Sequence, residues 1–76
     1  MDKDSVKASF GRYLTKVRKE RGLSIHQLAI DCDMEYSHLQ RIEKGKVDIA
    51  LTTMVAIFKG LELSAEEQAA LFRSLK

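Results

Sequence analysis

The sequence contains no proline and only one cysteine, and both facts narrow the possible folds. Without proline, no position forces a break in the interior of a helix. Cys32 has no partner within the chain for a disulfide, so we expect a reducing compartment and a fold stabilised by its core alone. A free cysteine is most often a small buried apolar residue, and we expect that role for Cys32.

Long apolar runs are also absent, and the first residues, Met1 to Asp4, lack the cationic start and apolar stretch of a signal peptide. We therefore expect a soluble, cytoplasmic protein that does not contact a membrane. With 76 residues, 45% of them hydrophobic, the chain has enough material for one core. The length predicts a single domain over residues 1–76 that is too small for a deep enzyme cleft.

Sequence features of catalytic and metal sites are missing as well. His26 and His38 lie twelve positions apart, and no Cys or His accompanies either at the spacing of metal ligands. There is no glycine-rich phosphate loop and no nucleophile motif, and the scattered carboxylates show no catalytic pairing. We expect neither an enzyme, a metal, a cofactor nor a small-molecule substrate.

Charge is distributed unevenly along the chain, although the net charge is only +2. Residues 1–22 carry seven basic and three acidic side chains, whereas residues 23–45 carry two basic and four acidic ones. The basic start of the chain could face phosphates, but a charge-rich helix is more often a solvated face.

Apolar residues recur at steps of three and four, which predicts five short helices and no sheet. Gly22 is expected to end the first helix. Ser24 and Gln27 form a capping box that begins a second helix, which breaks at Asp33 and Met34.

The third helix is predicted from about Glu35 to Lys44, with Leu39 and Ile42 inward and Gly45 at its end. A fourth helix is indicated by five apolar residues: Leu51, Met54, Val55, Phe58 and Leu61. We expect a loosened turn at Gly60, Glu62 and Leu63. A second capping box, Ser64 with Glu67, opens the last helix, which runs through Leu75.

Two short helices joined by a tight break are typical of a helix-turn-helix, in which the second helix enters the major groove of DNA. The pattern alone is ambiguous, because many helical bundles contain such a pair. The identities of the residues along this part of the chain are more specific than the helix pattern. They are Arg18 to Ser24, then Gln27, Leu28 and Ala29, then Leu39 and Arg41 to Lys46, then Leu51, Met54, Ile57, Leu61 and Ser64.

Over roughly residues 10–64, this succession resembles the Cro/C1-type (XRE-like) helix-turn-helix transcriptional regulators, with no gap between the anchors. The resemblance implies an all-α, compact, five-helix, lambda-repressor-like DNA-binding domain. It also implies a bacterial or phage transcriptional regulator, such as a repressor. Its partners would be a double-stranded DNA operator, read by the third helix, and a second copy in a homodimer.

The resemblance also assigns roles to individual residues. Four would contact DNA bases, namely Tyr36, Ser37, Arg41 and, less strongly, Gln40. Three would contact the DNA backbone: Ser24, Lys44 and Lys46. Arg18 and Glu43 stand where the family often joins the first and third helices by an ion pair, which is a structural role. Simpler alternatives remain open at the base-contacting positions: a surface aromatic, solvated polar side chains, or an arginine paired with a carboxylate.

Several residues depart from the family pattern. Glu35 occupies the entry to the third helix, where Ser or Thr is usual, and its charge repels DNA. Ile25 replaces a frequent Gln, and Asp33 replaces the common turn glycine, although Asp tolerates the left-handed conformation. Asp31 adds a further negative charge beside the motif.

These departures favour an alternative in which the same scaffold serves as a protein-interaction module, such as an antitoxin-like or regulatory partner. An apolar last helix, with Leu71, Phe72 and Leu75, favours the same alternative. That helix either forms a dimer surface or is needed to close the small core.

Overall fold

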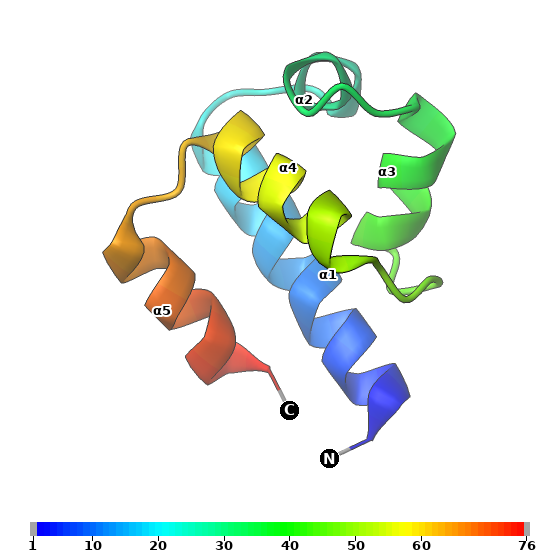
Figure 1. The fold of residues 1–76 in the computed structure, drawn as a ribbon, viewed down its shortest axis with the longest axis vertical. Coiled ribbons are helices and arrows are strands. Elements are labelled where there is room, and N and C mark those ends of the chain that lie inside the picture. The colour runs from blue at the N-terminus through cyan, green and yellow to red at the C-terminus, as the bar shows by residue number, and fades with distance from the viewer. Residues whose placement is uncertain (1, 76) are drawn as a thin grey trace.

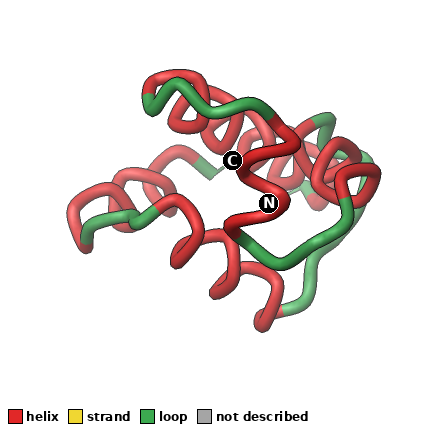
Figure 2. The backbone as a smooth tube through the Cα atoms, turned by 90° about the horizontal axis from the view of Figure 1, so that it is seen from above, coloured by secondary structure: helices red, strands yellow, loops and turns green. Residues whose placement is uncertain are grey.

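The computed structural model describes residues 2–75, which form five α-helices and no strand. The helices are α1 (Lys3–Glu20), α2 (Ile25–Asp31), α3 (Tyr36–Glu43), α4 (Leu51–Leu61) and α5 (Ala65–Ser74). Short loops join them in Figure 2. The all-α, five-helix prediction is confirmed.

Two glycines end helices where the sequence predicted. Gly22 and Gly45 have φ angles of +69° and +70°, a conformation that costs glycine little because it has no Cβ. After each glycine the chain turns back onto the helix it leaves. The Leu23 amide donates to the Arg18 carbonyl at 3.1 Å, and the Lys46 amide donates to the Arg41 carbonyl at 3.0 Å.

The two predicted capping boxes differ in outcome. The Ser64 hydroxyl accepts from the Glu67 amide and the Glu67 carboxylate accepts from the Ser64 amide, so this box is complete. At α2 the prediction was wrong in its second half. The Ser24 hydroxyl accepts from the Gln27 amide at 3.0 Å, but the Gln27 side chain donates to Asp31 one turn further on.

The fourth helix corrects one expectation about where it ends. Gly60 lies inside α4 and not in the turn; a Cβ there would lie 2.4 Å from the Cys32 sulfur. Glycine is therefore required for the close approach of α4 to the end of α2. In addition, Leu51 and Val55 are exposed, whereas Ile57 and Leu61 are buried. The core-facing side of α4 is thus formed by Ile57 and Leu61, with Met54 and Phe58 packed partly against the core.

The helices surround one apolar core. In Figure 1, α1 runs behind α4, with α5 on one side and α3 on the other, and α2 is seen nearly end-on. α1 packs against α3 and α5, and α2 packs against α3 and α4. The side chains without solvent contact at the centre come from three helices: Leu28, Leu39 and Ile57. Cys32 is buried beside them, as expected.

Of the two roles that the sequence left open for the last helix, closing the core is the one that the structure shows. Leu71 is buried and closes the core, whereas Phe72, the next residue, is 51% exposed. Two polar contacts fix α5 to α1. The Tyr13 hydroxyl donates to the Glu67 carbonyl at 2.9 Å, and Arg21 donates to the Glu67 carboxylate at 2.8 Å. Desolvation on burial is the main cause that raises the pKa of Tyr13.

Candidate nucleic-acid interface

The turn between α2 and α3 sets the relative orientation of the two helices. Asp33 adopts a φ of 53°, in the left-handed region that Asp tolerates better than most residues. Its amide donates to the Ile30 carbonyl at 3.1 Å, and the Met34 amide donates to the Ala29 carbonyl at 2.9 Å. These two bonds end α2 as glycine ends α1 and α3, so the turn is sharp without glycine.

The buried face of α3 determines which side chains point outward. Leu39 and Ile42 are fully buried, which commits the opposite side of the helix to solvent. Ser37, Arg41 and Lys44 lie three or four positions apart and are exposed, and Gln40 is half-buried beside them. Three of the four predicted base-contacting residues therefore share the outward face of α3.

Tyr36, the fourth predicted base-contacting residue, lies on the flank of α3 that faces α2. It is 37% exposed, and its ring stacks on His26 of α2 with the ring centroids 4.1 Å apart and the planes inclined by 19°. Sequence reasoning missed His26, because the contact joins two helices and depends on the geometry of the turn.

The predicted backbone-contacting residues lie at the ends of the motif. Lys44 caps the C-terminus of α3 and Lys46 begins the following loop, and both are exposed. Ser24 is exposed at the N-cap of α2. Lys44 and Lys46 follow the C-terminal end of α3, whereas Glu35 at its N-cap brings a negative charge to the other end and makes no side-chain capping bond.

Arg18 and Glu43 form a nearly buried ion pair between α1 and the end of α3. Arg18 Nε donates to Glu43 Oε2 at 2.7 Å and Nη2 donates to Oε1 at 3.0 Å, with only 10% and 6% of the two side chains exposed. The remaining Arg18 donor, Nη1, bonds the Leu23 carbonyl at 2.8 Å. This fork ties α3 to the end of α1 and to the chain that enters α2.

The Thr15 hydroxyl completes this network from α1. It lies 2.9 Å from Glu43 Oε1 and 2.8 Å from the Gly11 carbonyl, and its single proton serves one acceptor at a time. Within residues 2–75, no buried side-chain nitrogen or oxygen lacks a hydrogen-bond partner. The polar groups that fix α3 are thus fully paired, which gives its outward face a rigid support.

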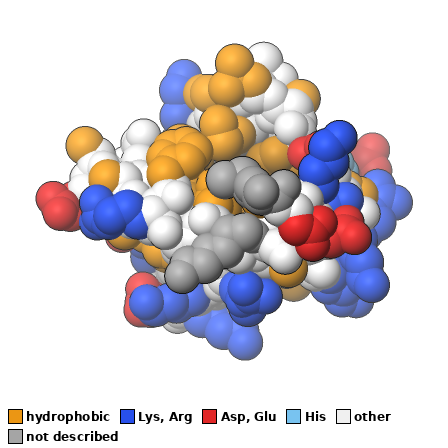
Figure 3. All heavy atoms as spheres, turned by 90° about the horizontal axis from the view of Figure 1, so that it is seen from below, with side chains coloured by type: hydrophobic (Ala, Val, Ile, Leu, Met, Phe, Trp, Pro, Cys, Tyr) orange, Lys and Arg blue, Asp and Glu red, His pale blue; other side chains and the backbone are white. Residues whose placement is uncertain are grey.

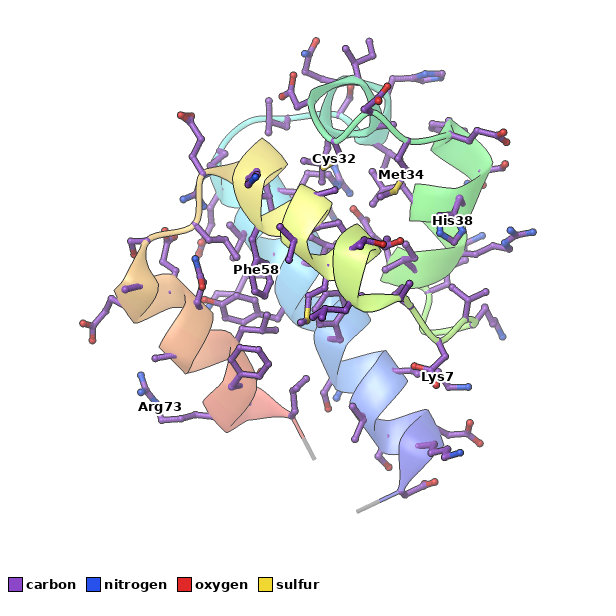
Figure 4. The ribbon with its side chains drawn as sticks, viewed as in Figure 1. Lys7, Cys32, Met34, His38, Phe58 and Arg73 are labelled. Carbon is purple, nitrogen blue, oxygen red and sulfur yellow. The ribbon has the colours of Figure 1, made fainter. Side chains whose placement is uncertain are left out.

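A hollow of about 450 Å³ lies beside α3, between the turn and the first half of α4. Cys32 and Met34 form part of it, and His38 and Arg41 border it from α3. Figure 4 shows Cys32, Met34 and His38 in this region. Burial raises the pKa of the Cys32 thiol to about 11, so the thiol is neutral near pH 7.

Within residues 2–75, no three His, Cys, Asp or Glu side chains are grouped so as to hold a metal ion. In the same part of the chain, no helix combines the length and apolar character needed to cross a membrane.

Two short helices joined by a tight turn, the second with a solvent-exposed outer face, are the architecture of the helix-turn-helix class of DNA-binding proteins. Residues 9–71 match the model of a family described as "Helix-turn-helix domain". The chain belongs to this family, whose members are DNA-binding transcriptional regulators, and its resemblance to the Cro/C1 type is confirmed.

One relative is the control protein C.MunI from Mycoplasma sp., which is 32% identical over 65 residues. The match covers 84% of this chain and 88% of that protein. The fold is also similar to the restriction-modification controller protein C.AhdI from Aeromonas hydrophila, with 25% identity, a TM-score of 0.74, and 79% and 91% of the two chains covered.

The wild-type restriction-modification controller protein C.Esp1396I has the same fold, with a TM-score of 0.82 at 21% identity and 91% of each chain covered. That protein has also been solved as a tetramer in complex with its natural 35-base-pair operator.

Proposed function

We propose that this chain is a controller protein of a restriction-modification system, which binds a double-stranded operator as a homodimer. The 32% sequence identity to the control protein C.MunI supports the assignment. The similar structures of the controller proteins C.AhdI and C.Esp1396I support it as well. The proposal treats residues 1–76 as one domain that acts on cytoplasmic DNA, and it involves no cofactor or catalysis.

The observation that carries DNA recognition is the outward face of α3. Ser37 and Arg41 are exposed there with Gln40 between them, and the buried Leu39 and Ile42 on the opposite side prevent the helix from rotating. An α-helix fits the major groove, where each base pair presents a distinct pattern of donors and acceptors. In this proposal Ser37, Gln40 and Arg41 contact base edges, and Tyr36 does so from the flank.

Arg41 has the most specific role, because a guanidinium can donate two hydrogen bonds to O6 and N7 of one guanine. Lys44, Lys46 and the N-terminus of α2 at Ser24 would contact phosphates on either side. Phosphate contacts carry no sequence information, but they fix the helix in register with the bases.

One α3 helix contacts only a few base pairs, so useful specificity requires two copies on a two-fold symmetric site. The surface that best suits a second copy lies on α4 and α5, where Val55 and Phe72 are 42% and 51% exposed. Phe58 points from α4 toward α5 in Figure 4 and meets Phe72 edge-on, with ring centroids 6.2 Å apart. A cluster of exposed and half-buried apolar side chains of this kind is a surface on which a second copy can pack.

Selection of bound duplexes from a random library tests this proposal without assuming an operator. We expect a two-fold symmetric consensus, bound with an affinity that falls steeply with salt because phosphate contacts release counterions. Matches to the consensus should lie in front of restriction or methyltransferase genes in the source genome. A consensus found only in front of unrelated genes would leave DNA binding intact and remove the restriction-modification assignment.

One observation favours the alternative protein-interaction module. Ile30 is exposed on α2 next to the exposed, acidic Asp31 and Asp33, a combination that suits a protein partner better than DNA. If selection returned no enriched duplex at low salt, this second function would replace the first.

A further inference from the structure

Two aromatic side chains connect the helices of the motif directly. His26 is the second residue of α2 and Tyr36 is the first residue of α3, and their rings stack with centroids 4.1 Å apart. The planes are nearly parallel, at 19°, so the imidazole covers one face of the Tyr36 ring. The contact spans the turn and lies where α3 begins, beside the exposed Ser37.

The stack limits how the Tyr36 side chain can move. An unrestrained side chain at the surface samples several rotamers, and ordering it during binding costs free energy. With one ring face held by His26 and 37% of the residue still exposed, Tyr36 has a defined orientation before it meets a ligand. Such preorganisation favours a partner that fits this one orientation over partners that do not.

We infer that His26 is a positioning residue, which fixes the Tyr36 ring for contact with a base and so sets sequence preference without touching a base itself. The inference rests on the proposed function, in which Tyr36 contacts DNA bases. His26 is exposed, so its stack contributes little to the core, and its effect should be seen in specificity more than in stability.

Replacing His26 by Phe or Ala separates positioning from the other role open to this residue, donation of a hydrogen bond to a phosphate. Phenylalanine can stack on Tyr36 but cannot donate, whereas alanine can do neither. Tyr36→Ala removes the stacked partner. Gln27→Ala is the matched control, because Gln27 is the next exposed residue of α2 and its side chain bonds Asp31.

Affinity for the selected operator, divided by affinity for a scrambled duplex of equal length and salt, gives the specificity ratio. His26→Ala should lower this ratio about two- to tenfold, the range that corresponds to one aromatic pair. His26→Phe should keep the ratio near that of the parent chain, and Gln27→Ala should leave it unchanged. Tyr36→Ala should lower it at least as much as His26→Ala.

Nuclear magnetic resonance of the free protein tests the stack without DNA. The ring current of Tyr36 should move the His26 ring protons upfield, and Tyr36→Ala should return them toward the values of an exposed histidine. Thermal melts followed by circular dichroism verify that each variant is folded. If the His26 protons showed no such shift, the positioning role would be overturned whatever the DNA result.

The remaining outcomes separate this inference from the proposed function. If Tyr36→Ala lowered the ratio while His26→Ala did not, His26 would have no positioning role and base contact by Tyr36 would stand. If His26→Phe lost as much affinity as His26→Ala on both duplexes, His26 would be a phosphate contact. If the parent chain had no preference for any duplex, the proposed function would fail and this inference with it.

Discussion

The Arg18–Glu43 pair is the residue-scale feature on which the placement of α3 depends. A buried charge that loses its partner is left without compensation, which typically costs about 3 to 5 kcal/mol. We therefore expect Glu43→Ala to lower the free energy of unfolding by about that amount, measured by urea denaturation.

Asp4→Ala is the matched control, since the Asp4 side chain is almost fully exposed in its ion pair with Lys7. Its effect should stay below about 1 kcal/mol, because water screens exposed pairs. If Glu43→Ala left stability unchanged while DNA affinity fell, the pair would belong to the binding surface and not to the scaffold.

Glu35 is a second residue whose role can be isolated. It occupies the N-cap of α3 without a side-chain capping bond, and its charge lies where α3 would enter the groove. Glu35→Ser should raise affinity for every duplex, because it removes repulsion from phosphates, and should stabilise α3 by up to about 1 kcal/mol through a new cap.

Fluorescence anisotropy with operator and scrambled duplexes checks the affinities of Glu35→Ser. Glu66→Ser, which removes the same charge from the exposed first turn of α5, is the control and should change affinity less. Equal effects of the two substitutions would mean that only net charge matters and that Glu35 points away from DNA.

At the scale of helices, the sequence predicted what is local and missed what is tertiary. Glycine ends, the Ser64 cap and apolar spacing act within one helix, and they located all five helices. Gly60 was misplaced, because its contact with Cys32 arises only when α4 meets α2. The outward position of Arg41 follows from helical spacing, whereas the His26–Tyr36 stack does not.

The packing of α5 against α1 should become less stable at acid pH, because Glu67 becomes protonated. Its hydrogen bond with Arg21, together with the Ser64 amide, lowers the pKa of the Glu67 carboxyl from 4.5 to about 2. A carboxyl whose pKa is lower in the folded state stabilises that state fully above the unfolded pKa and loses this effect as pH falls. The contribution of Glu67 should therefore be complete above pH 4.5 and disappear toward pH 2.

Melting temperatures of the parent chain and of Glu67→Gln across this pH range isolate the effect from that of other carboxyls. Glutamine keeps the shape and can still cap α5, but it does not titrate. The difference between the two proteins should be constant near neutral pH and shrink as the pH falls. A difference independent of pH would show that the Glu67 charge adds nothing to the attachment of α5.

Arg41 and Lys46 represent the two kinds of DNA contact proposed for α3 and its end. Arg41→Ala should cost about 1 to 3 kcal/mol on the selected operator and far less on scrambled DNA, because a base contact is lost. Lys46→Ala should weaken binding to both duplexes alike. It should also reduce the slope of log affinity against log salt concentration by about one per chain, or about two per dimer.

A salt series on both duplexes measures the two effects in one experiment. If Arg41→Ala weakened operator and scrambled DNA equally, base recognition would rest on Tyr36, Ser37 or Gln40 instead. If neither substitution altered binding, the protein-interaction alternative would be favoured.

One face of the molecule holds much of its apolar surface apart from its basic side chains. Seen from below (Figure 3), hydrophobic side chains gather above the centre of the view, and Lys and Arg lie mostly toward its edges. In Figure 1, α3 and α5 lie on opposite sides of α1, and α4 lies in front of it. A second copy bound through α4 and α5 would therefore leave the outward face of α3 free for DNA in both subunits.

Phe72 allows a direct test of this arrangement. A large aromatic side chain at the centre of an interface commonly contributes at least about 2 kcal/mol, so Phe72→Glu should raise the dimer dissociation constant about 30-fold or more. Sedimentation velocity over a concentration series measures this change, and circular dichroism verifies the fold, since Phe72 also contacts Phe58. Ile30→Glu is the control, because Ile30 is more exposed than Phe72 but lies on α2. The dimer dissociation constant of the Ile30→Glu variant should equal that of the parent chain.

Operator binding by Phe72→Glu should then require a higher protein concentration and become less cooperative, because each half-site is bound by an independent chain. If Phe72→Glu remained as dimeric as the parent chain, the second copy would bind elsewhere and the exposed ring would serve only to cover Phe58.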